Sequence, residues 1–327
     1  MADVTWWMGS ILVNILIVGN GFDLAHGLPT AYADFLNAKA IDEKLRDNKW
    51  MKYFLRITND ANGIGKTWID FESEIEKTLE HIINLPDINP RDSQRKSLHD
   101  APQIKELMNN PNFQADYVDK EKYIKCLVED LNSLEAALED YMAGINYSIV
   151  STRIPEIQNL SVDKLLSFNY TNTYTMLYDK HGKLRNDDCC YIHGVVGAGN
   201  LILGYQKKTT GINEQSEDGL LDIRFRKYYQ RILKETGNIY RDWLEEDSVN
   251  IYVFGFSLAM SDRDTIREFM RAPNVERVTI FYHCEDSHAQ LIENLVRVLG
   301  EDRVIEMVYE KKIVFKRQQN SIPIYVS

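Results

Sequence analysis

Apolar positions along the chain predict a parallel β-sheet that is interrupted by helices. Short apolar runs, typical of buried parallel strands, occur once near the N-terminus and repeatedly in the C-terminal half. These runs are residues 15–18, 164–168, 190–193, 201–203, 250–254, 277–282 and 312–315. Helical patterns fall between several of them, as the crossover connections of a parallel sheet require. We therefore expect an α/β fold with a Rossmann-like doubly wound parallel sheet.

Residues 41–154 show no strand pattern and predict a large helical insertion. Apolar residues recur at helical spacing in 68–85 and in 123–145. The segment between them, 86–119, is rich in proline and polar residues and predicts a loop, which we interpret as a candidate lid. A further helix is expected over 221–244, after a second polar loop.

The domain organisation follows from this change of pattern. Residues 11–40 and 155–327 are expected to form one Rossmann-like nucleotide-binding domain. Residues 41–154 are expected to form an inserted helical lid or regulatory domain. The chain of 327 residues is long enough for each part to bury its own core.

Composition and charge exclude several classes of function. The net charge of -11 disfavours strong nucleic-acid binding, which depends on clustered Lys and Arg. Cys126, Cys189, Cys190 and Cys284 form no C-x-x-C pair, so we expect neither a zinc site nor a disulfide framework. The apolar run 11–18 is too short to cross a membrane and lacks the flanks of a signal peptide, so we expect a cytoplasmic protein without membrane contact.

A glycine-rich motif follows the first apolar run. Residues 15–30 read Ile-Leu-Ile-Val-Gly-Asn-Gly-Phe-Asp-Leu-Ala-His-Gly-Leu-Pro-Thr. Gly19 and Gly21 permit a sharp turn and close approach to the phosphates or ribose of a nucleotide. The third glycine of the dinucleotide fingerprint is missing, which disfavours a standard dehydrogenase. Thr30 is expected to cap a helix over 31–40.

Three polar motifs follow apolar runs in the C-terminal half. They are Ser-Phe-Asn-Tyr-Thr at 167–171, Ile-His-Gly at 192–194 and Val-Phe-Gly-Phe-Ser-Leu at 253–258. In a doubly wound sheet the ligand lies at the carboxyl ends of the strands. We therefore expect these motifs to share one cleft with the glycine-rich turn.

The motifs occur in the order in which the sirtuin family has similar ones. Sirtuins run from the first strand into Gly-Ala-Gly-x-Ser and then Gly-Ile-Pro-Asp-Phe-Arg, and residues 19–21 and 27–29 fall at the same offsets. The chain resembles more closely the AbiH family of phage abortive-infection proteins. That resemblance lies in the glycine-rich motif, in 68–72 and in 255–262. It implies a role in phage defence, and the sirtuin-like motifs imply NAD as the bound nucleotide.

The resemblance to sirtuins implies cleavage of the nicotinamide–ribose bond of NAD. Asn169 matches the asparagine that orders the ribose and the attacking water. His193 matches the catalytic histidine, and imidazole titrates close enough to neutral pH to act as a base. The structural alternatives are a turn asparagine and a buried histidine bonded to a carbonyl. The candidate nucleotide-binding residues are Gly19, Asn20, Gly21, Phe22, Asp23, His26, Gly255, Phe256, Ser257 and Asp262.

At four positions the sequence either departs from the sirtuin pattern or allows more than one role. Asp23 and His26 fit AbiH but depart from sirtuins, and a carboxylate repels a pyrophosphate unless it is paired or binds a hydroxyl or metal. Asp23 is therefore a candidate for positioning water or the nicotinamide ribose. Asp262 either binds a ribose hydroxyl or caps the helix that begins near residue 263. Glu72 is either exposed, paired within the protein, or catalytic.

The leading hypothesis is a cytoplasmic abortive-infection effector that hydrolyses NAD, with NAD as substrate and no metal. Its expected partners are a small-molecule nucleotide, a phage-derived trigger and further copies of itself. The missing four-cysteine module disfavours the peptide deacylation of sirtuins. One alternative is a nucleotide-sensing module without catalysis. Another is a metal-dependent nuclease that uses Asp23, Asp262 and Glu72.

Overall fold

A computed structural model describes most of the chain and divides it into two compact units. The described residues are 12–40, 42–59, 70–83, 120–150, 152–179, 181–207, 220–245, 248–319 and 322–323. One unit, here the sheet unit, comprises Met1–Leu28, Asn146–Ile192 and Gly237–Ser327. The other, the helical unit, comprises Pro29–Ile145 and His193–Thr236.

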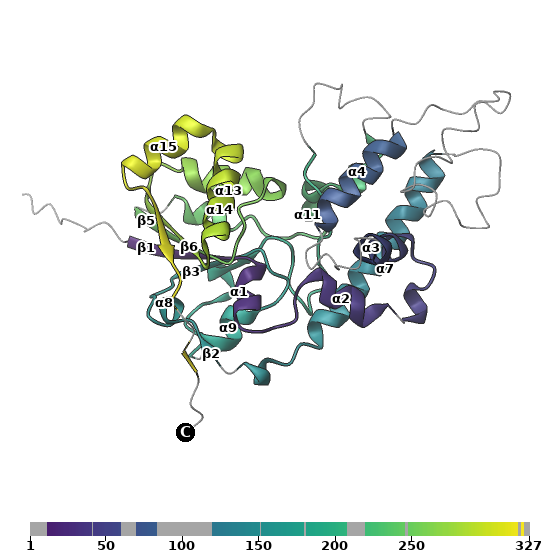
Figure 1. The fold of residues 1–327 in the computed structure, drawn as a ribbon, viewed down its shortest axis with the longest axis horizontal. Helices are drawn as coiled ribbons and strands as arrows, with labels where there is room; N and C mark the ends of the chain where they lie inside the picture. Colours follow the sequence, from purple (N-terminus) through teal and green to yellow (C-terminus); the bar gives the residue numbers. More distant parts are fainter. Residues whose placement is uncertain are drawn as a thin grey trace, which may run out of the picture. The chain divides into compact units, whose positions relative to one another are not determined.

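A six-stranded parallel sheet forms the framework of the sheet unit (Figure 1). Its strands are β1 (Leu12–Val18), β3 (Lys164–Ser167), β4 (Cys189–Tyr191), β5 (Ser248–Phe254), β6 (Val275–Tyr282) and β7 (Ile313–Arg317). They lie in the order β4-β3-β1-β5-β6-β7, and every neighbouring pair is parallel. The α/β prediction is confirmed. The chain builds outward from β1 on one side and then from β5 on the other, so the topological switch point lies between these two strands.

The central strand β1 shows why its sequence is a continuous apolar run. Ile15 and Ile17 belong to one buried cluster, and Leu16 and Val18 belong to another. Successive side chains of a strand point to opposite faces, so both faces of the sheet are covered. On one face lie α13 (Arg263–Arg271), α14 (Glu285–Leu299) and α15 (Glu301–Tyr309), as Figure 1 shows.

The second face of the sheet carries three short helices. They are α1 (Asn20–Ala25), α8 (Pro155–Gln158) and α9 (Thr173–Leu177). Phe22 of α1 and Tyr174 of α9 join the same buried cluster as Leu16 and Val18. Helix α1 was not predicted, because its motif was interpreted as a turn. The sheet unit also contains η3 (Tyr147–Ile149), η4 (Asn186–Asp188), α12 (Tyr240–Trp243), η6 (Met260–Asp262) and the antiparallel pair β2 (Thr152–Arg153) and β8 (Ile322–Pro323).

The described part of the helical unit is built around an aromatic core. Its elements are α2 (Tyr32–Lys39), η1 (Glu43–Leu45), α3 (Lys49–Asn59), α4 (Phe71–Ile83), α7 (Lys120–Ala143), η5 (Ile223–Phe225) and α11 (Lys227–Leu233). Phe54 and Phe71 stack with ring centroids 3.9 Å apart, and Trp50 packs on both Phe54 and Phe225. The predicted helices at 68–85 and 123–145 therefore exist, with shorter or shifted ends.

Three local predictions were wrong. Residues 201–203 form no strand, although they are buried, and the nearest pairing is a single bridge between Tyr205 and Arg226. The helix expected over 221–244 is broken into η5, α11 and α12, because the backbone extends at Arg226 and turns again before α12. Helix α2 begins after Ala31 rather than Thr30, and Asp34 accepts the Ala31 N–H in place of a side-chain cap.

The division into units differs from the predicted domain borders. The helical unit starts at Pro29 instead of residue 41 and includes His193–Thr236, which the prediction placed in the Rossmann-like domain. The predicted lid at 86–119 lies outside the described residues, as does most of the second polar loop. Among the helices that are described, none combines the length and apolarity that crossing a membrane requires.

Candidate functional site

The glycine-rich turn is packed tightly against the backbone that follows β5. Gly19 donates its N–H to the Phe254 carbonyl at 3.2 Å, and Gly21 donates to the Gly255 carbonyl at 2.8 Å. A Cβ atom on Gly19 would lie 2.6 Å from Cα of Phe256, and one on Gly21 would lie 2.8 Å from Cα of Gly255. The space that these glycines leave is therefore filled by protein backbone. Their predicted role in nucleotide binding stays a prediction.

Gly255 completes this contact from the other side. Its φ of +65° lies in the left-handed region, and a Cβ there would come within 2.1 Å of the Phe22 nitrogen. The Phe22 N–H donates to the Gly19 carbonyl at 2.8 Å. A phosphate-binding turn presents backbone N–H groups to its ligand, whereas the N–H groups of Gly19, Gly21 and Phe22 bind backbone carbonyls. The turn's chemistry toward a ligand must come mainly from side chains.

The side chain of Asp23 lies at the centre of a buried polar cluster in the sheet unit. Asp23 is carried by α1 and is 0% exposed. Thr171 Oγ1 donates to Asp23 Oδ2 at 2.5 Å, and Thr173 Oγ1 donates to Thr171 Oγ1 at 3.0 Å. The Asn169 side chain lies near enough to Asp23 to lower its pKa. The carboxyl ends of β1 and β3 thus bring Asp23 and Asn169 together.

Two oxygen atoms of this cluster have no hydrogen-bond partner among the described residues. They are Oδ1 of Asp23 and Oδ1 of Asn169, and both are buried. A buried acceptor without a partner costs about 1–3 kcal/mol, and native proteins contain few of them. A bound group that carries O–H donors would satisfy both atoms.

The electrostatics of Asp23 follow from its burial. Burial raises the pKa of Asp23 to about 6, although hydrogen bonds from Thr171, Thr173 and Asn169 act to lower it. Tyr147 of η3 and Tyr191 of β4 lie near enough to feel its negative charge, and burial raises the pKa of each. A carboxyl with a pKa near 6 is ionised at neutral pH yet takes up a proton readily. These are the properties of a group that transfers protons.

His26 has a different environment within the same unit. Its Nδ1 lies 2.7 Å from the Phe22 carbonyl oxygen, and its Nε2 lies 2.7 Å from the Tyr178 hydroxyl. The same hydroxyl accepts the Ile154 N–H at 2.9 Å. Burial lowers the pKa of His26, which favours the neutral ring. Both ring nitrogens are engaged within the protein, so His26 links α1 to α9.

The predicted residues at and beyond the end of β5 lie in several environments. Phe256 stacks on Phe168, with ring centroids 3.9 Å apart. Ser257 is exposed, and its carbonyl accepts from Asn294 Nδ2 at 2.8 Å. Asp262 is buried and occupies the N-cap position of α13, but its side chain makes no capping hydrogen bond. Asp262 therefore stands at the start of α13, as the helix-cap interpretation predicts, but its carboxylate does not cap the helix.

His193 belongs to the helical unit, whereas the cluster around Asp23 belongs to the sheet unit. His193 is buried, and its carbonyl accepts the Ile202 N–H at 2.9 Å. Gly194 has a φ of +80°, and a Cβ there would lie 2.2 Å from the Asn200 carbonyl oxygen. The room expected beside Gly194 for a ligand is thus occupied by Asn200.

Sequence reasoning missed the residues that hold these predicted side chains in place. Thr171 and Thr173 orient Asp23, and their alternation after a strand was the available signal. Glu139 of α7 accepts the N–H groups of Gly197 and Gly199, each at 2.9 Å, and so anchors the loop after His193. Nothing in the pattern of α7 indicated this contact.

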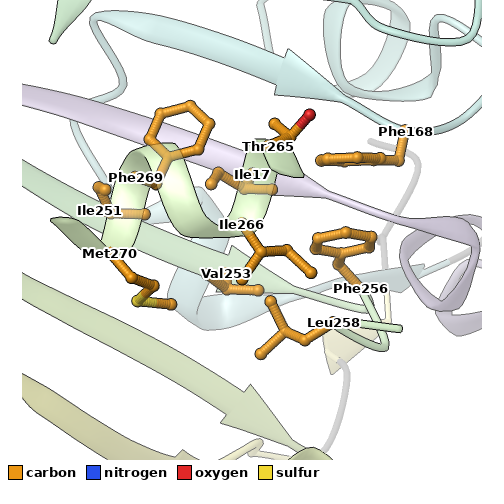
Figure 2. Close-up of a pocket in the computed structure, with 10 residues that line it drawn as sticks. All are labelled: Ile17, Phe168, Ile251, Val253, Phe256, Leu258, Thr265, Ile266, Phe269 and Met270. Carbon is orange, nitrogen blue, oxygen red and sulfur yellow. The ribbon is translucent and has the colours of Figure 1, made fainter. Parts of the chain in front are cut away.

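Figure 2 shows an apolar pocket between α13 and the sheet. The rings of Phe168 and Phe256 face each other at one end of it. Its volume of about 10 Å³ is no more than one water molecule needs, and Thr265 supplies the only side-chain hydroxyl that the figure shows there. This pocket is a packing gap. The polar cluster around Asp23 is the candidate site because it holds two buried oxygens without partners among the described residues.

Glu72 and the other potential metal ligands have no shared site in the described part of the chain. Glu72 forms an ion pair with Lys227 at 2.9 Å, and both side chains are almost fully covered. Of its three sequence-based interpretations, the pairing within the protein is the one observed. No group of three or more His, Cys, Asp or Glu residues among those described is arranged to hold a metal ion.

The chain matches a known protein family. A family model described as "Bacteriophage abortive infection AbiH" matches residues 15–284. The match begins in β1 and covers the glycine-rich turn and all three polar motifs. No curated protein matches the chain.

Proposed function

Because this chain belongs to the AbiH family of bacteriophage abortive infection proteins, we propose that it is an effector that hydrolyses the nicotinamide–ribose bond of NAD. The observation that carries the proposal is the pair of unpartnered oxygens, Asp23 Oδ1 and Asn169 Oδ1, buried at the carboxyl ends of two central strands. This edge of a doubly wound sheet is where such folds bind nucleotides.

A ribose ring has the chemistry that these two oxygens lack. Its neighbouring hydroxyls supply two O–H donors, whereas carboxylate and amide oxygens only accept. The ribose carbon that loses nicotinamide also gains positive charge, which a buried carboxylate such as Asp23 stabilises. Asn169 can accept from one hydroxyl and donate through its amide nitrogen without adding charge.

The reaction requires no acid to help the leaving group. The bond from ribose C1′ to the nicotinamide nitrogen breaks, and its electron pair neutralises the pyridinium ring. Water adds to C1′ and loses one proton to a base, which the sirtuin-like motif assigns to His193. Loss of NAD in an infected cell would stop phage growth at the host's expense. A phage-derived trigger and self-association belong to the same proposal.

Binding without turnover is the second candidate function. The same two oxygens would hold a ribose equally well in a nucleotide sensor. The engaged N–H groups of the glycine-rich turn favour recognition of the sugar over the pyrophosphate in either case. Only a measurement of product separates the two functions.

The test is nicotinamide release by the purified protein and by lysate of phage-infected cells that express it. NAD, NADP and ATP are supplied separately, with and without magnesium. Asn169→Ala is expected to lose at least about 100-fold in rate. Asn159→Ala, which truncates an exposed asparagine of the same unit, is the matched control and keeps full activity. Binding of NAD without nicotinamide release, in both preparations, would support the sensor instead.

A further inference from the structure

We propose that Asp23 is the base of this site and takes the proton from the water that adds to ribose C1′. This inference rests on the proposed NAD hydrolysis and moves the proton-accepting role from His193 to a residue of the sheet unit. Sirtuin-like motifs have no carboxylate at this position. The contacts of Asp23 within the protein support its role as the base.

The two carboxylate oxygens of Asp23 differ in their surroundings. Oδ2 is held by Thr171 at 2.5 Å, and Thr171 is itself oriented by Thr173. Oδ1 has no partner among the described residues. One oxygen is thus fixed by hydroxyls while the other keeps its lone pairs for a donor. A base that must stay in one orientation during proton transfer has this arrangement.

Asn169 supplies the second contact that the attacking water needs. Its side chain acts on the Asp23 pKa from close by, and its own Oδ1 is buried without a partner among the described residues. Each of the two oxygens has two lone pairs, so besides a ribose hydroxyl it can accept one O–H of the attacking water. The lone pair of the water oxygen then remains for C1′. The proton moves to Asp23 as the new C–O bond forms, and nicotinamide leaves with the electron pair of the broken C–N bond.

Among the described residues, none of the groups that act on the Asp23 pKa is a cation. The segment after β3 presents the neutral side chains of Asn169, Thr171 and Thr173, and these are the groups that act on the Asp23 pKa besides burial. Tyr147 and Tyr191 face Asp23 from η3 and β4, and burial raises the pKa of both, so they are neutral at physiological pH. On its own turn, His26 is kept neutral because burial lowers its pKa.

The contrast with Asp188 shows how the same unit treats an aspartate that supports the fold. Asp188 is also buried, but Lys164 Nζ lies 2.9 Å from its Oδ1, and the Arg185 N–H donates to its Oδ2 at 2.9 Å. Despite burial, these contacts bring the pKa of Asp188 down to about 2. Asp23 has no such support, so its carboxylate costs stability. A buried carboxylate with a raised pKa and no counter-ion is typical of a functional site.

The proton leaves from the oxygen that accepts it. Once nicotinamide and ADP-ribose have left the site, water that replaces them takes the proton from Asp23 Oδ1. The net products are nicotinamide, ADP-ribose and one proton.

The test combines nicotinamide release with unfolding of the same variants. Asp23→Asn is expected to lower kcat by about 100- to 10,000-fold, with a much smaller change in KM. Asp23→Glu restores part of the activity. Wild-type kcat falls below about pH 6, and the residual activity of His193→Ala falls in the same range. Asp23→Asn also unfolds at a higher temperature than wild type at pH 8, whereas Asp188→Asn unfolds at a lower one.

The outcomes separate this inference from the proposed function. If the wild-type protein releases nicotinamide and Asp23→Asn does so equally fast, the base is another group and only this inference is overturned. If Asp23→Asn is inactive and also less stable than wild type at pH 8, Asp23 is a structural residue and the inference is again wrong. If wild-type protein and infected-cell lysate release no nicotinamide, the hydrolysis itself is refuted, and a catalytic base with it.

Discussion

Two buried carboxylates, one in each unit, have opposite surroundings. In the helical unit, Asp222 is 1% exposed and is bound by the guanidinium of Arg226, with Nη2 2.5 Å from Oδ1, and by the hydroxyl of Tyr205. In the sheet unit, Asp23 is equally buried, but its bonded partners are hydroxyl and amide groups without charge. Asp222 is paired with a cation, whereas Asp23 keeps Oδ1 available for a ligand.

Other buried carboxylates of the helical unit follow the Asp222 pattern. Glu72 is paired with Lys227 at 2.9 Å, and Glu135 is paired with Lys234 at 2.5 Å. A paired buried charge keeps segments in register but has little left for a ligand. The comparison teaches that burial of a charge does not by itself mark a functional site. A buried carboxylate without a counter-ion is the better candidate for a functional group.

The largest expected effect is the loss of Asp222. Asp222→Ala leaves the guanidinium of Arg226 buried without its carboxylate, so we expect unfolding to become easier by about 3–5 kcal/mol. Urea unfolding followed by circular dichroism measures this change. The double variant Asp222→Leu, Arg226→Met removes both charges and should recover much of the loss. A single-variant loss below about 1 kcal/mol would mean that the pair does not support the unit.

The next largest effect concerns the turn that carries Asp23. Gly255→Ala combines a positive φ with a Cβ that meets the Phe22 nitrogen, and we expect a loss of about 3 kcal/mol or more. Gly27→Ala is the matched control, because Gly27 has a similar φ of +72° and nothing within 4 Å of the added Cβ. It should lose only about 1–2 kcal/mol. Equal losses in thermal or urea unfolding would show that close packing does not fix this turn.

We expect the substitution Asp23→Asn to stabilise the protein at pH 8. The pKa of Asp23 rises from about 4 in the unfolded chain to about 6 in the folded protein. The folded state therefore holds the proton more tightly, and stability falls as pH rises from about 4 to 6. Above pH 6 the cost is about 3 kcal/mol, of which the hydrogen bond lost in Asp23→Asn offsets about 1 kcal/mol. Asp23→Asn should therefore raise the free energy of unfolding by about 2 kcal/mol at pH 8, and this gain should become smaller toward pH 4.

Asp188 provides the control of opposite sign. Its folded pKa is lowered to about 2 despite burial, so its contribution is present above about pH 4 and is lost as pH falls toward 2. Asp188→Asn should therefore destabilise the sheet unit by about 1–3 kcal/mol at pH 8. If the unfolding midpoints of Asp23→Asn and Asp188→Asn shift in the same direction at pH 8, the two aspartates do not differ in their effect on stability.

The smallest expected effect belongs to His26. Burial lowers its folded pKa, so the unfolded chain binds a proton more readily, and stability is lost as pH falls below about 6.5. We expect a change of about 1 kcal/mol or less. The unfolding midpoint is best followed in the Asp23→Asn background, because Asp23 has the opposite pH trend in the same range. In that background, His26→Gln should abolish the change of the unfolding midpoint with pH.

The apolar pattern by itself determined the sheet and the neighbourhood of the site. Both faces of β1 are buried, so its sequence had to be apolar throughout, and that signal is local. The same reasoning placed Asp23 and Asn169 near each other, because the carboxyl ends of parallel strands share one edge. The extended backbone at Arg226, which breaks the helix expected over 221–244, carries no comparable local signal.

Only the tertiary structure decided what each polar residue does. The space beside Gly19 and Gly194 was expected for a ligand but is filled by residues from other segments, Phe256 and Asn200. The pairing of Glu72 with Lys227 joins residues far apart in the chain. The pKa of Asp23 depends on burial by segments that meet only in the folded protein. Sequence periodicity reports which residues are buried, whereas counter-ions and hydrogen-bond partners are set by contacts across the fold.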